Sequence, residues 1–211
     1  MRSPFDFQRN ALLYLPPELP DPRSPEHTPA VGDIVKRTVQ ASEGRTFVLV
    51  TSFRALNQLQ KQLRDSIEFP LLVQGDAPKA ELLDQFRDAG NAVLLGTSSF
   101  WEGVDVRGEA LSCVIIDKLP FAAVGDPVMR SRMDAMKQQG LEPFREFQLP
   151  QAVITLKQGV GRLIRDAADR GVLVLCDPRL RTRGYGRTFL QSLPPMPVTD
   201  DFQQVEEFFV R

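Results

Sequence analysis

The chain has 211 residues, of which 42% are hydrophobic and 25% are charged, and its formal net charge is −1 at pH 7. This composition is ordinary for a soluble globular protein and argues against a surface coated with nucleic-acid-binding charge. No apolar run approaches the roughly 20 residues of a membrane span, and the first residues lack the hydrophobic core of a signal peptide. We therefore expect a cytoplasmic protein with no membrane contact.

Seven prolines fall within the first 30 residues, and each proline fixes φ and removes a backbone donor. We interpret residues 1–30 as an extended connector. Residues 31–193 then form one domain, in which short apolar runs alternate with helical periodicity. A second proline-rich break opens a C-terminal tail, residues 194–211.

Within the domain, short runs rich in branched residues predict buried strands at 47–51, 71–73, 92–95, 112–116 and 171–176. Helical periodicity predicts helices at 53–66, 78–89, 127–139 and 149–166. Strands that alternate with helices predict an α/β fold, a parallel sheet with helices on both faces. Ligands of such sheets collect beyond the carboxyl ends of the strands, so the polar residues that follow the strands are the candidates for function.

One such segment, Gly96-Thr-Ser-Ser-Phe-Trp-Glu-Gly-Val-Asp105, begins where a predicted strand ends. Small hydroxyls and glycines at this place allow backbone N–H groups to face a phosphate, while Glu102 and Asp105 can hold an arginine, a ribose hydroxyl or water. Taken alone, the segment could equally be a polar turn. We expect Phe100 and Trp101 to be core or domain-interface residues rather than platforms for base stacking.

The last predicted helix carries the segment Gln158-Gly-Val-Gly-Arg-Leu-Ile-Arg165. On a continuous helix its apolar residues form one arc, and Gln158, Arg162 and Arg165 lie opposite. Two glycines in a helix interior cost roughly 1 kcal/mol each, so we expect a backbone or ligand to approach closely there. A rigid arginine pair suits phosphate, which the guanidinium fork binds bidentately. Surface salt bridges to nearby aspartates are the alternative.

Charge is unevenly distributed along the chain. Between Lys157 and Arg187 there are eight Lys or Arg and three Asp or Glu, so this stretch carries +5 and the remainder −6. A local basic patch on a neutral domain fits phosphate binding better than general adhesion. A solvated arginine-rich face is the alternative.

The two polar segments, in this order and about 55 residues apart, resemble motifs V and VI of the XPD/DinG family of superfamily 2 helicases. The resemblance extends from Ser3 to Leu193, is nearest to the bacterial DinG and YoaA branch, and includes further ordered matches: Ser3-Pro-Phe-Asp6, Tyr14-Leu-Pro-Pro17, Val50-Thr-Ser-Phe53, Lys118-Leu-Pro-Phe121, Asp126-Pro127, Asp177-Pro-Arg179, Tyr185-Gly186 and Ser192-Leu-Pro194. The sequence lacks the family's phosphate loop, its Asp-Glu-x-His magnesium segment and its four-cysteine cluster. All of these belong to the first motor domain, and we expect this chain to begin after it.

This resemblance implies the second RecA-like motor domain of an ATP-dependent 5′-to-3′ DNA helicase of DNA repair and replication. This chain alone would be inactive as an ATPase. ATP and Mg²⁺ would be shared with the absent first motor domain of the same polypeptide, and a 4Fe–4S cluster would belong to the parent protein. We expect no metal or iron–sulfur cluster in this chain. Such sites need about four thiolate or imidazole ligands, whereas Cys113 and Cys176 lie in apolar runs and the one histidine is His27.

The resemblance also implies a role for each candidate residue. Arg162 and Arg165 would act as arginine fingers on the transferring phosphoryl group, and Gln158 would position the γ-phosphate or the attacking water. Residues expected to line the nucleotide are Glu102, Gly103, Asp105 and Gly161. Residues expected to contact the backbone of single-stranded DNA are Thr51, Ser52, Gln74, Thr97 and Ser98.

A different class of function remains open for the tail. Its apolar residues Phe202, Val205, Phe208 and Phe209 stand at i, i+3, i+6 and i+7, beside acidic residues. This stripe could cover its own domain, or it could dock into a partner's groove. For the docking alternative, the resemblance implies a replication clamp-loader accessory subunit, a chi-like subunit of DNA polymerase III. A nucleotide-binding α/β domain unrelated to helicases is a third hypothesis.

Overall fold

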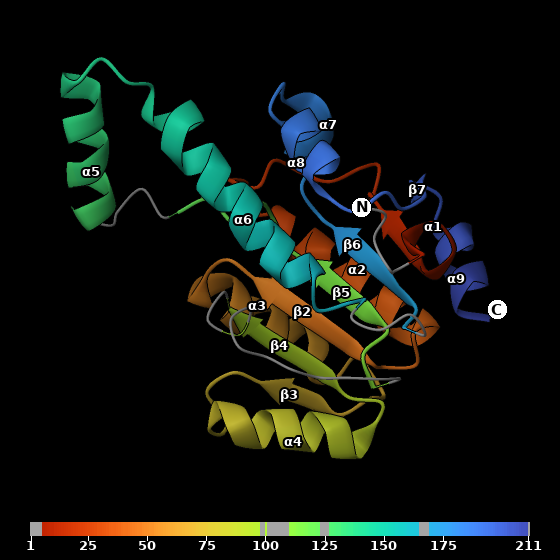
Figure 1. Ribbon diagram of the computed structural model, residues 1–211. Coiled ribbons are helices and arrows are strands. Elements are labelled where there is room, and N and C mark those ends of the chain that lie inside the picture. Colours follow the sequence, from red (N-terminus) through yellow and green to blue (C-terminus); the bar gives the residue numbers. More distant parts are fainter. Residues whose placement is uncertain (1–5, 98–99, 101–109, 123–126, 165–168, 211) are drawn as a thin grey trace.

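The structure is a computed structural model, and it describes residues 6–97, 100, 110–122, 127–164 and 169–210. The strands of this part of the chain form one parallel sheet in the order β3-β4-β2-β5-β6-β1-β7 (Figure 1). Their bounds are β1 Ala11–Tyr14, β2 Thr46–Val50, β3 Leu71–Val73, β4 Val93–Thr97, β5 Cys113–Ile116, β6 Gly171–Leu175 and β7 Val198–Thr199. The predicted α/β parallel sheet is confirmed.

Helices cover both faces of this sheet (Figure 1). Their bounds are α1 Phe7–Asn10, α2 His27–Ala41, α3 Phe53–Leu63, α4 Lys79–Ala89, α5 Pro127–Gln138, the π-helix Phe144–Gln148, α6 Leu149–Val160, α7 Arg179–Thr182, α8 Gly186–Ser192 and α9 Phe202–Val210. Because alternate strand residues point to opposite faces, the core divides in two. Helices α4, α6 and α8 pack on one face, and α2, α3 and α9 pack on the other. Among the described residues, no helix is both long and apolar enough to span a membrane.

Strand β1 lies within the segment that the sequence analysis interpreted as an extended connector. It pairs with β6 on one side and β7 on the other, so it is an interior strand of the sheet. All four of its residues are buried, since a strand enclosed between two layers of helices has no solvent face. Five of the seven prolines that suggested a connector lie between Leu15 and Glu26, where the chain is neither helix nor strand.

The C-terminal tail is also part of the domain. Strand β7 extends the sheet, and α9 packs on it with Phe202 and Val205 buried. The Phe202 ring meets the ring of Tyr14 edge-on at 5.6 Å, and the guanidinium of Arg37 lies 4.1 Å from its centroid. Of the two alternatives for the tail, the structure therefore shows the one in which it covers its own domain.

Helix α5 and the π-helix form an arm that leaves the body of the domain (Figure 1). No residue of α5 is buried, and the Val128 side chain is 75% exposed. A cluster of aromatic rings joins the base of the arm to α8: Phe121 stacks on Phe144 at 5.7 Å, and both rings contact Tyr185 edge-on. The arm is thus attached by rings at its base and exposed along its length.

Candidate functional site

The carboxyl edge of the sheet brings two of the predicted contact residues together. Gln74 follows β3, and Thr97 ends the neighbouring strand β4. The Thr97 backbone N–H and hydroxyl both donate to the Oε1 atom of Gln74, at 2.6 and 2.8 Å. The Gln74 side-chain amide therefore joins the ends of β3 and β4, and the two hydrogen bonds to its oxygen fix the orientation of the amide.

Thr51 and Ser52 follow the next strand, β2, at the same edge. The Thr51 N–H donates to Oδ1 of Asp117 at 3.1 Å, and its hydroxyl donates to Oδ2 at 3.4 Å. Ser52 is the N-cap of α3, where its hydroxyl accepts the N–H of Ala55 at 3.2 Å. Both hydroxyls thus have a structural partner, and both residues remain partly exposed at the strand end.

Phe53, the first residue of α3, adds an aromatic surface that the sequence analysis did not assign to the site. Its side chain is 62% exposed, although large aromatic residues normally bury most of their surface. It stands directly after Thr51 and Ser52 at the carboxyl edge.

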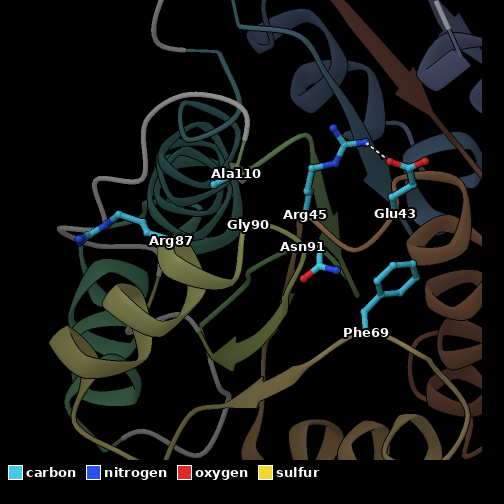
Figure 2. Close-up of a pocket in the computed structure, with 7 residues that line it drawn as sticks. All are labelled: Glu43, Arg45, Phe69, Arg87, Gly90, Asn91 and Ala110. Carbon is cyan, nitrogen blue, oxygen red and sulfur yellow. Dashed lines mark hydrogen bonds and ion pairs between the residues drawn. The ribbon is translucent and has the colours of Figure 1, made fainter.

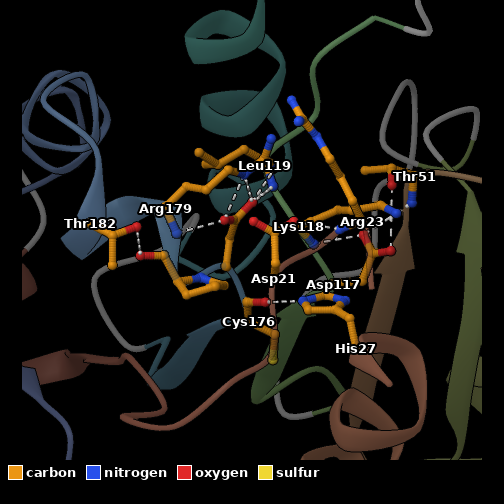
Figure 3. Close-up of polar contacts among 12 residues, drawn as sticks. Asp21, Arg23, His27, Thr51, Asp117, Lys118, Leu119, Cys176, Arg179 and Thr182 are labelled. Carbon is orange, nitrogen blue, oxygen red and sulfur yellow. Dashed lines mark hydrogen bonds and ion pairs between the residues drawn. The ribbon is translucent and has the colours of Figure 1, made fainter. Parts of the chain in front are cut away.

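Behind the exposed edge lies a buried polar cluster (Figure 3). The Asp117 carboxylate accepts from Thr51 and from the backbone N–H of Lys118, and burial raises its pKa to about 7 despite the nearby Lys118 charge. One strand away, Asp177 accepts the Leu119 N–H at 2.7 Å and the fork of Arg179, with the shortest contact at 2.6 Å. Asp177 is therefore paired with a cation inside the domain, whereas Asp117 has hydrogen-bond donors but no ion pair among the described residues.

His27, the first residue of α2, belongs to the same cluster (Figure 3). Its Nε2 atom lies 2.9 Å from the carbonyl oxygen of Cys176, so that nitrogen donates. Burial lowers the pKa of His27 below its ordinary 6.5, and the Lys118 and Arg179 charges lower it further. The histidine is consequently a neutral structural donor near neutral pH.

The predicted phosphate-binding residues lie at the end of α6. The helix ends at Val160, earlier than the predicted residue 166. Beyond Gly161 the backbone tightens to i→i−3 bonds, from Arg162 N–H to the Gly159 carbonyl at 3.2 Å and from Leu163 N–H to the Val160 carbonyl at 3.0 Å. Because glycine disfavours a helix interior, these two glycines permit the change. The prediction that Arg162 lies on a continuous helix is therefore wrong.

This turn is nevertheless held firmly. Leu163 and Ile164 are 2% and 6% exposed, and they anchor the segment in the core. Gln158 is exposed on the last turn of α6, and Arg162 is half-buried. A Cβ added at Gly161 would meet the Lys157 carbonyl oxygen at 3.2 Å, which is a tight contact. The structure thus presents an amide and a guanidinium on a rigid support.

Five predicted site residues lie outside the described part of the chain: Ser98, Glu102, Gly103, Asp105 and Arg165. Phe100 is described, and it is a core residue with 5% exposure that packs against Gly96. The structure brings Gln74 together with Thr97, and Thr51 with Asp117. Gln158 comes from a different element, the last turn of α6.

Comparison with known proteins decides the family. The model of the helicase C-terminal domain matches residues 35–196. The chain belongs to this family. The helicase domain is of the XPD/DinG type: the ATP-dependent DNA helicase YoaA of Escherichia coli K12 is 52% identical to it over 206 residues, and the 3′-5′ exonuclease DinG of Bacillus subtilis 168 is 33% identical over 208.

These relatives are much longer than this helicase domain. The aligned region covers 98% of this chain and 32% of the E. coli protein, and 95% of this chain and 22% of the B. subtilis protein. A solved XPD structure without ligand superposes with a TM-score of 0.69 at 21% identity, over 91% of this chain and 40% of that one. Dbp5 bound to RNA and ADP–BeF3 superposes with a TM-score of 0.61 at 17% identity, over 97% and 45%. The structural matches establish the RecA-like fold.

A separate cavity of about 690 Å³ opens at the opposite, amino-terminal edge of the helicase domain (Figure 2). Arg45 precedes β2, Asn91 precedes β4, and Ala110 precedes β5, so its walls come from strand beginnings. Glu43 and Arg45 have φ angles of 53° and 42°, in the left-handed region. Among the described residues, no predicted site residue lines this cavity.

The helicase domain does not itself fit an iron–sulfur cluster. Such clusters take about four cysteine ligands, and the chain contains two cysteines. Both are completely buried at strands, and burial raises the pKa of each thiol far above its ordinary value. A thiol that resists ionisation is a poor metal ligand, so Cys113 and Cys176 are core residues.

Proposed function

We propose that this chain is the second motor domain of an ATP-dependent DNA helicase that moves 5′ to 3′ on single-stranded DNA. In this proposal, ATP and Mg²⁺ lie in a cleft between two motor domains, and this chain forms the wall opposite the phosphate loop. The observation that carries it is the rigid end of α6, where Gln158 is exposed and Arg162 emerges from a turn anchored by Leu163 and Ile164.

Arg162 and Arg165 act on the phosphoryl group as it is transferred. A guanidinium placed against the developing charge of the transition state is worth about 10³ to 10⁵ in rate. Gln158 holds the γ-phosphate or orients the attacking water. Glu102, Gly103, Asp105 and Gly161 complete the nucleotide wall. This placement is supported by the core anchoring of the turn, since a finger functions only when its support is fixed.

Single-stranded DNA runs along the carboxyl edge past Gln74, Thr97, Ser98, Thr51 and Ser52. These side chains are uncharged, so they hold the backbone in position without reading sequence. Asp117 and Gln74 fix the strand-end hydroxyls before DNA arrives. Because β1 is an interior strand, the hinge that opens and closes the cleft lies before Ala11.

The chain alone does not hydrolyse ATP in this proposal, because the phosphate loop and the magnesium carboxylate are supplied by the first motor domain. The 4Fe–4S cluster likewise belongs to the parent protein. The supporting fact is that the chain spans about a third of the YoaA sequences it matches.

Arginine substitution in the polypeptide that carries both motor domains tests this function. We expect Arg162→Ala to lower DNA-stimulated ATP turnover by at least about 10²-fold. Arg162→Lys keeps the charge, lacks the planar fork, and should remain impaired. Lys157→Ala removes an exposed cation from the last turn of α6, just before this segment, so it is the matched control and should retain turnover.

A structural variant separates catalysis from folding. Leu163 is 2% exposed, so Leu163→Ala should destabilise the 211-residue chain by roughly 2 to 5 kcal/mol in denaturant unfolding. If Arg162→Ala lowers the stability of the chain by as much while the longer polypeptide keeps its specific activity, the arginine is structural and the proposed function loses its central residue.

The second candidate, docking of a chi-like polymerase subunit through the tail, has less support. Of the four residues expected to dock, Phe202 and Val205 are 8% and 0% exposed against the domain itself, and Phe208 and Phe209 are partly buried against its core. Val210, at 89% exposure, is the large apolar residue of α9 that faces solvent.

A further inference from the structure

A basic cavity lies between α7 and α8, and those proposed catalytic and DNA-contact residues that the structure describes do not line it. Its volume is about 560 Å³, and three of its lining residues are arginines: Arg181, Arg183 and Arg187. No acidic residue lines it within the described part of the chain. It belongs to the +5 stretch of the sequence but lies after β6, some distance along the chain from the Gln158–Arg165 segment.

One of the three arginines, Arg181, is fixed by contacts with the domain. The Nη2 atom of Arg181 donates to the Leu15 carbonyl oxygen at 2.7 Å and lies 3.5 Å from a carboxylate oxygen of Asp200. Arg181 therefore serves partly to join α7 to the end of β1. Arg183 and Arg187 are exposed, and the described residues show no ion pair for either. Two solvated guanidiniums thus share one concave surface.

The backbone between these arginines is closely packed. A Cβ added at Gly186 would meet the Leu180 carbonyl oxygen at 2.1 Å, so this position admits only glycine, and α7 and α8 are held tightly together. The Gly186 N–H donates to the Arg183 carbonyl oxygen at 2.9 Å. Arg183 and Arg187 are consequently carried on a rigid turn, which reduces the entropy lost when they bind a ligand.

Gly184 lines the same cavity for a different reason. A Cβ added there would meet no atom within 4 Å, and its φ lies outside the left-handed region. Neither packing nor backbone conformation therefore requires glycine at this position. Gly184 is exposed, and a larger side chain at this position would have open space beside the cavity.

We propose that the α7–α8 cavity is an anion site that binds phosphates of a DNA backbone through Arg183 and Arg187, as a second contact beyond the uncharged strand-end track. Guanidinium forks match phosphate oxygens bidentately, and two of them on one concave rigid surface hold two neighbouring phosphates better than isolated surface charges do. The assignment to DNA rests on the proposed function. The assignment of an anion site rests on the cavity itself.

The salt dependence of binding distinguishes the two kinds of contact. Each phosphate neutralised by a cation contributes a slope of about −0.7 to log K against log salt on single strands. Contacts through hydroxyls and amides release no counterions. The cavity should therefore account for salt sensitivity, and the track of Thr51, Ser52 and Thr97 should account for salt-independent affinity.

The test is to titrate the 211-residue chain with a fluorescent single-stranded oligonucleotide at several salt concentrations. For Arg183→Gln combined with Arg187→Gln, we expect the slope to become shallower by about 1.4, or about 7-fold less loss of affinity over a fourfold salt increase. Arg64→Gln combined with Arg130→Gln removes the same charge from exposed positions elsewhere and should leave the slope near that of the unaltered chain. Thr51→Ala should weaken binding without changing the slope.

Gly184→Leu fills the cavity while the charge stays the same, and it should also make the slope shallower. Thermal unfolding of the arginine and glycine variants should match that of the unaltered chain within the range of ordinary surface changes. If the double arginine variant and its control have equal slopes, the cavity is not a phosphate site and the inference is overturned.

Inorganic pyrophosphate as a probe separates this inference from the proposed function. Binding of pyrophosphate that is lost in Arg183→Gln and in Gly184→Leu supports the anion site even if the chain binds no DNA, in which case the proposed DNA track fails alone. In the opposite outcome, the chain binds the oligonucleotide, substitution of Arg183 and Arg187 leaves the salt slope unchanged, and pyrophosphate does not bind. This result is consistent with the proposed DNA track and contradicts an anion site in the cavity. Repeating the titration with a duplex shows which form of DNA the site prefers.

Discussion

The ends of β5 and β6 each place an aspartate at the carboxyl edge, and the two meet different partners. Asp117 and Asp177 are 3% and 4% exposed. Asp177 receives the fork of Arg179 through contacts of 2.6 to 3.1 Å. Asp117 receives backbone N–H groups and one hydroxyl. Equal burial therefore produces a neutralised ion pair at one strand end and a carboxyl with a pKa of about 7 at the other.

The difference comes from the residue that follows. In Asp177-Pro-Arg179, the arginine turns back onto the carboxylate at the start of α7. In Asp117-Lys118-Leu119, the Lys118 backbone donates, but its charge only partly offsets the effect of burial. A buried carboxylate is stabilised by a directed cation more than by a nearby one, because the fork supplies hydrogen bonds as well as charge.

The largest effect should come from breaking the ion pair. Arg179→Met leaves Asp177 buried without its cation, so we expect the chain to lose about 3 to 5 kcal/mol of unfolding free energy. Denaturant unfolding at pH 7 measures this. Arg183→Met, on the exposed turn nearby, should change stability by less than about 0.5 kcal/mol. If the two substitutions lowered the unfolding free energy equally, the ion pair between Arg179 and Asp177 would contribute no more to stability than an exposed arginine does.

A change of pH should reveal Asp117. Its pKa in the folded chain, about 7, exceeds the ordinary 3.8, so the folded state resists ionisation. Its contribution to the unfolding free energy is therefore greatest below about pH 4 and decreases by roughly 2 to 4 kcal/mol as the pH rises to about 7. Asp117→Asn keeps an acceptor for Thr51 and should remove this decrease. Unfolding of both proteins across the pH range provides the measurement, and parallel curves would contradict the assignment.

His27 should give the smallest effect, in the opposite direction. Because burial lowers its pKa below 6.5, its contribution to stability is complete above pH 6.5 and decreases as the pH falls further. We expect the unfolding free energy to decrease below pH 6.5, because the unfolded chain then takes up a proton that the buried ring resists. His27→Gln retains a donor for the Cys176 carbonyl and should abolish the loss. The difference between the two unfolding curves below pH 6.5 is the quantity to measure.

Much of the sheet could be predicted because buried parallel strands leave a continuous apolar signal. The runs at β2, β4, β5 and β6 are buried at every position, as their composition indicated. β1 has the same character over four residues, but the prolines after it favoured a connector. β7 has two residues, too few for any periodicity to show.

The candidate site was predictable in position but not in detail. Gln74 and Thr97 were expected at strand ends and lie there, yet their mutual bond joins residues from separate strands and depends on strand order. The end of α6 depends on a shift from i→i−4 to i→i−3 hydrogen bonds at Gly161 and Arg162, which a 100° periodicity does not register. Phe53 was passed over because exposure is decided by the direction of the preceding turn.

The place of β1 in the sheet has a consequence for how the chain folds. Ala11 pairs with Gly171, and Leu13 pairs with Val198. The first strand of this sheet in the sequence therefore pairs only with its last two strands, β6 and β7. Closing a loop of roughly 160 residues is entropically costly and slow compared with the local pairing of β3 with β4. The half of the sheet that carries β1 should therefore assemble late, and its four apolar residues remain exposed to water, or to a chaperone, until nearly the whole chain has been synthesised.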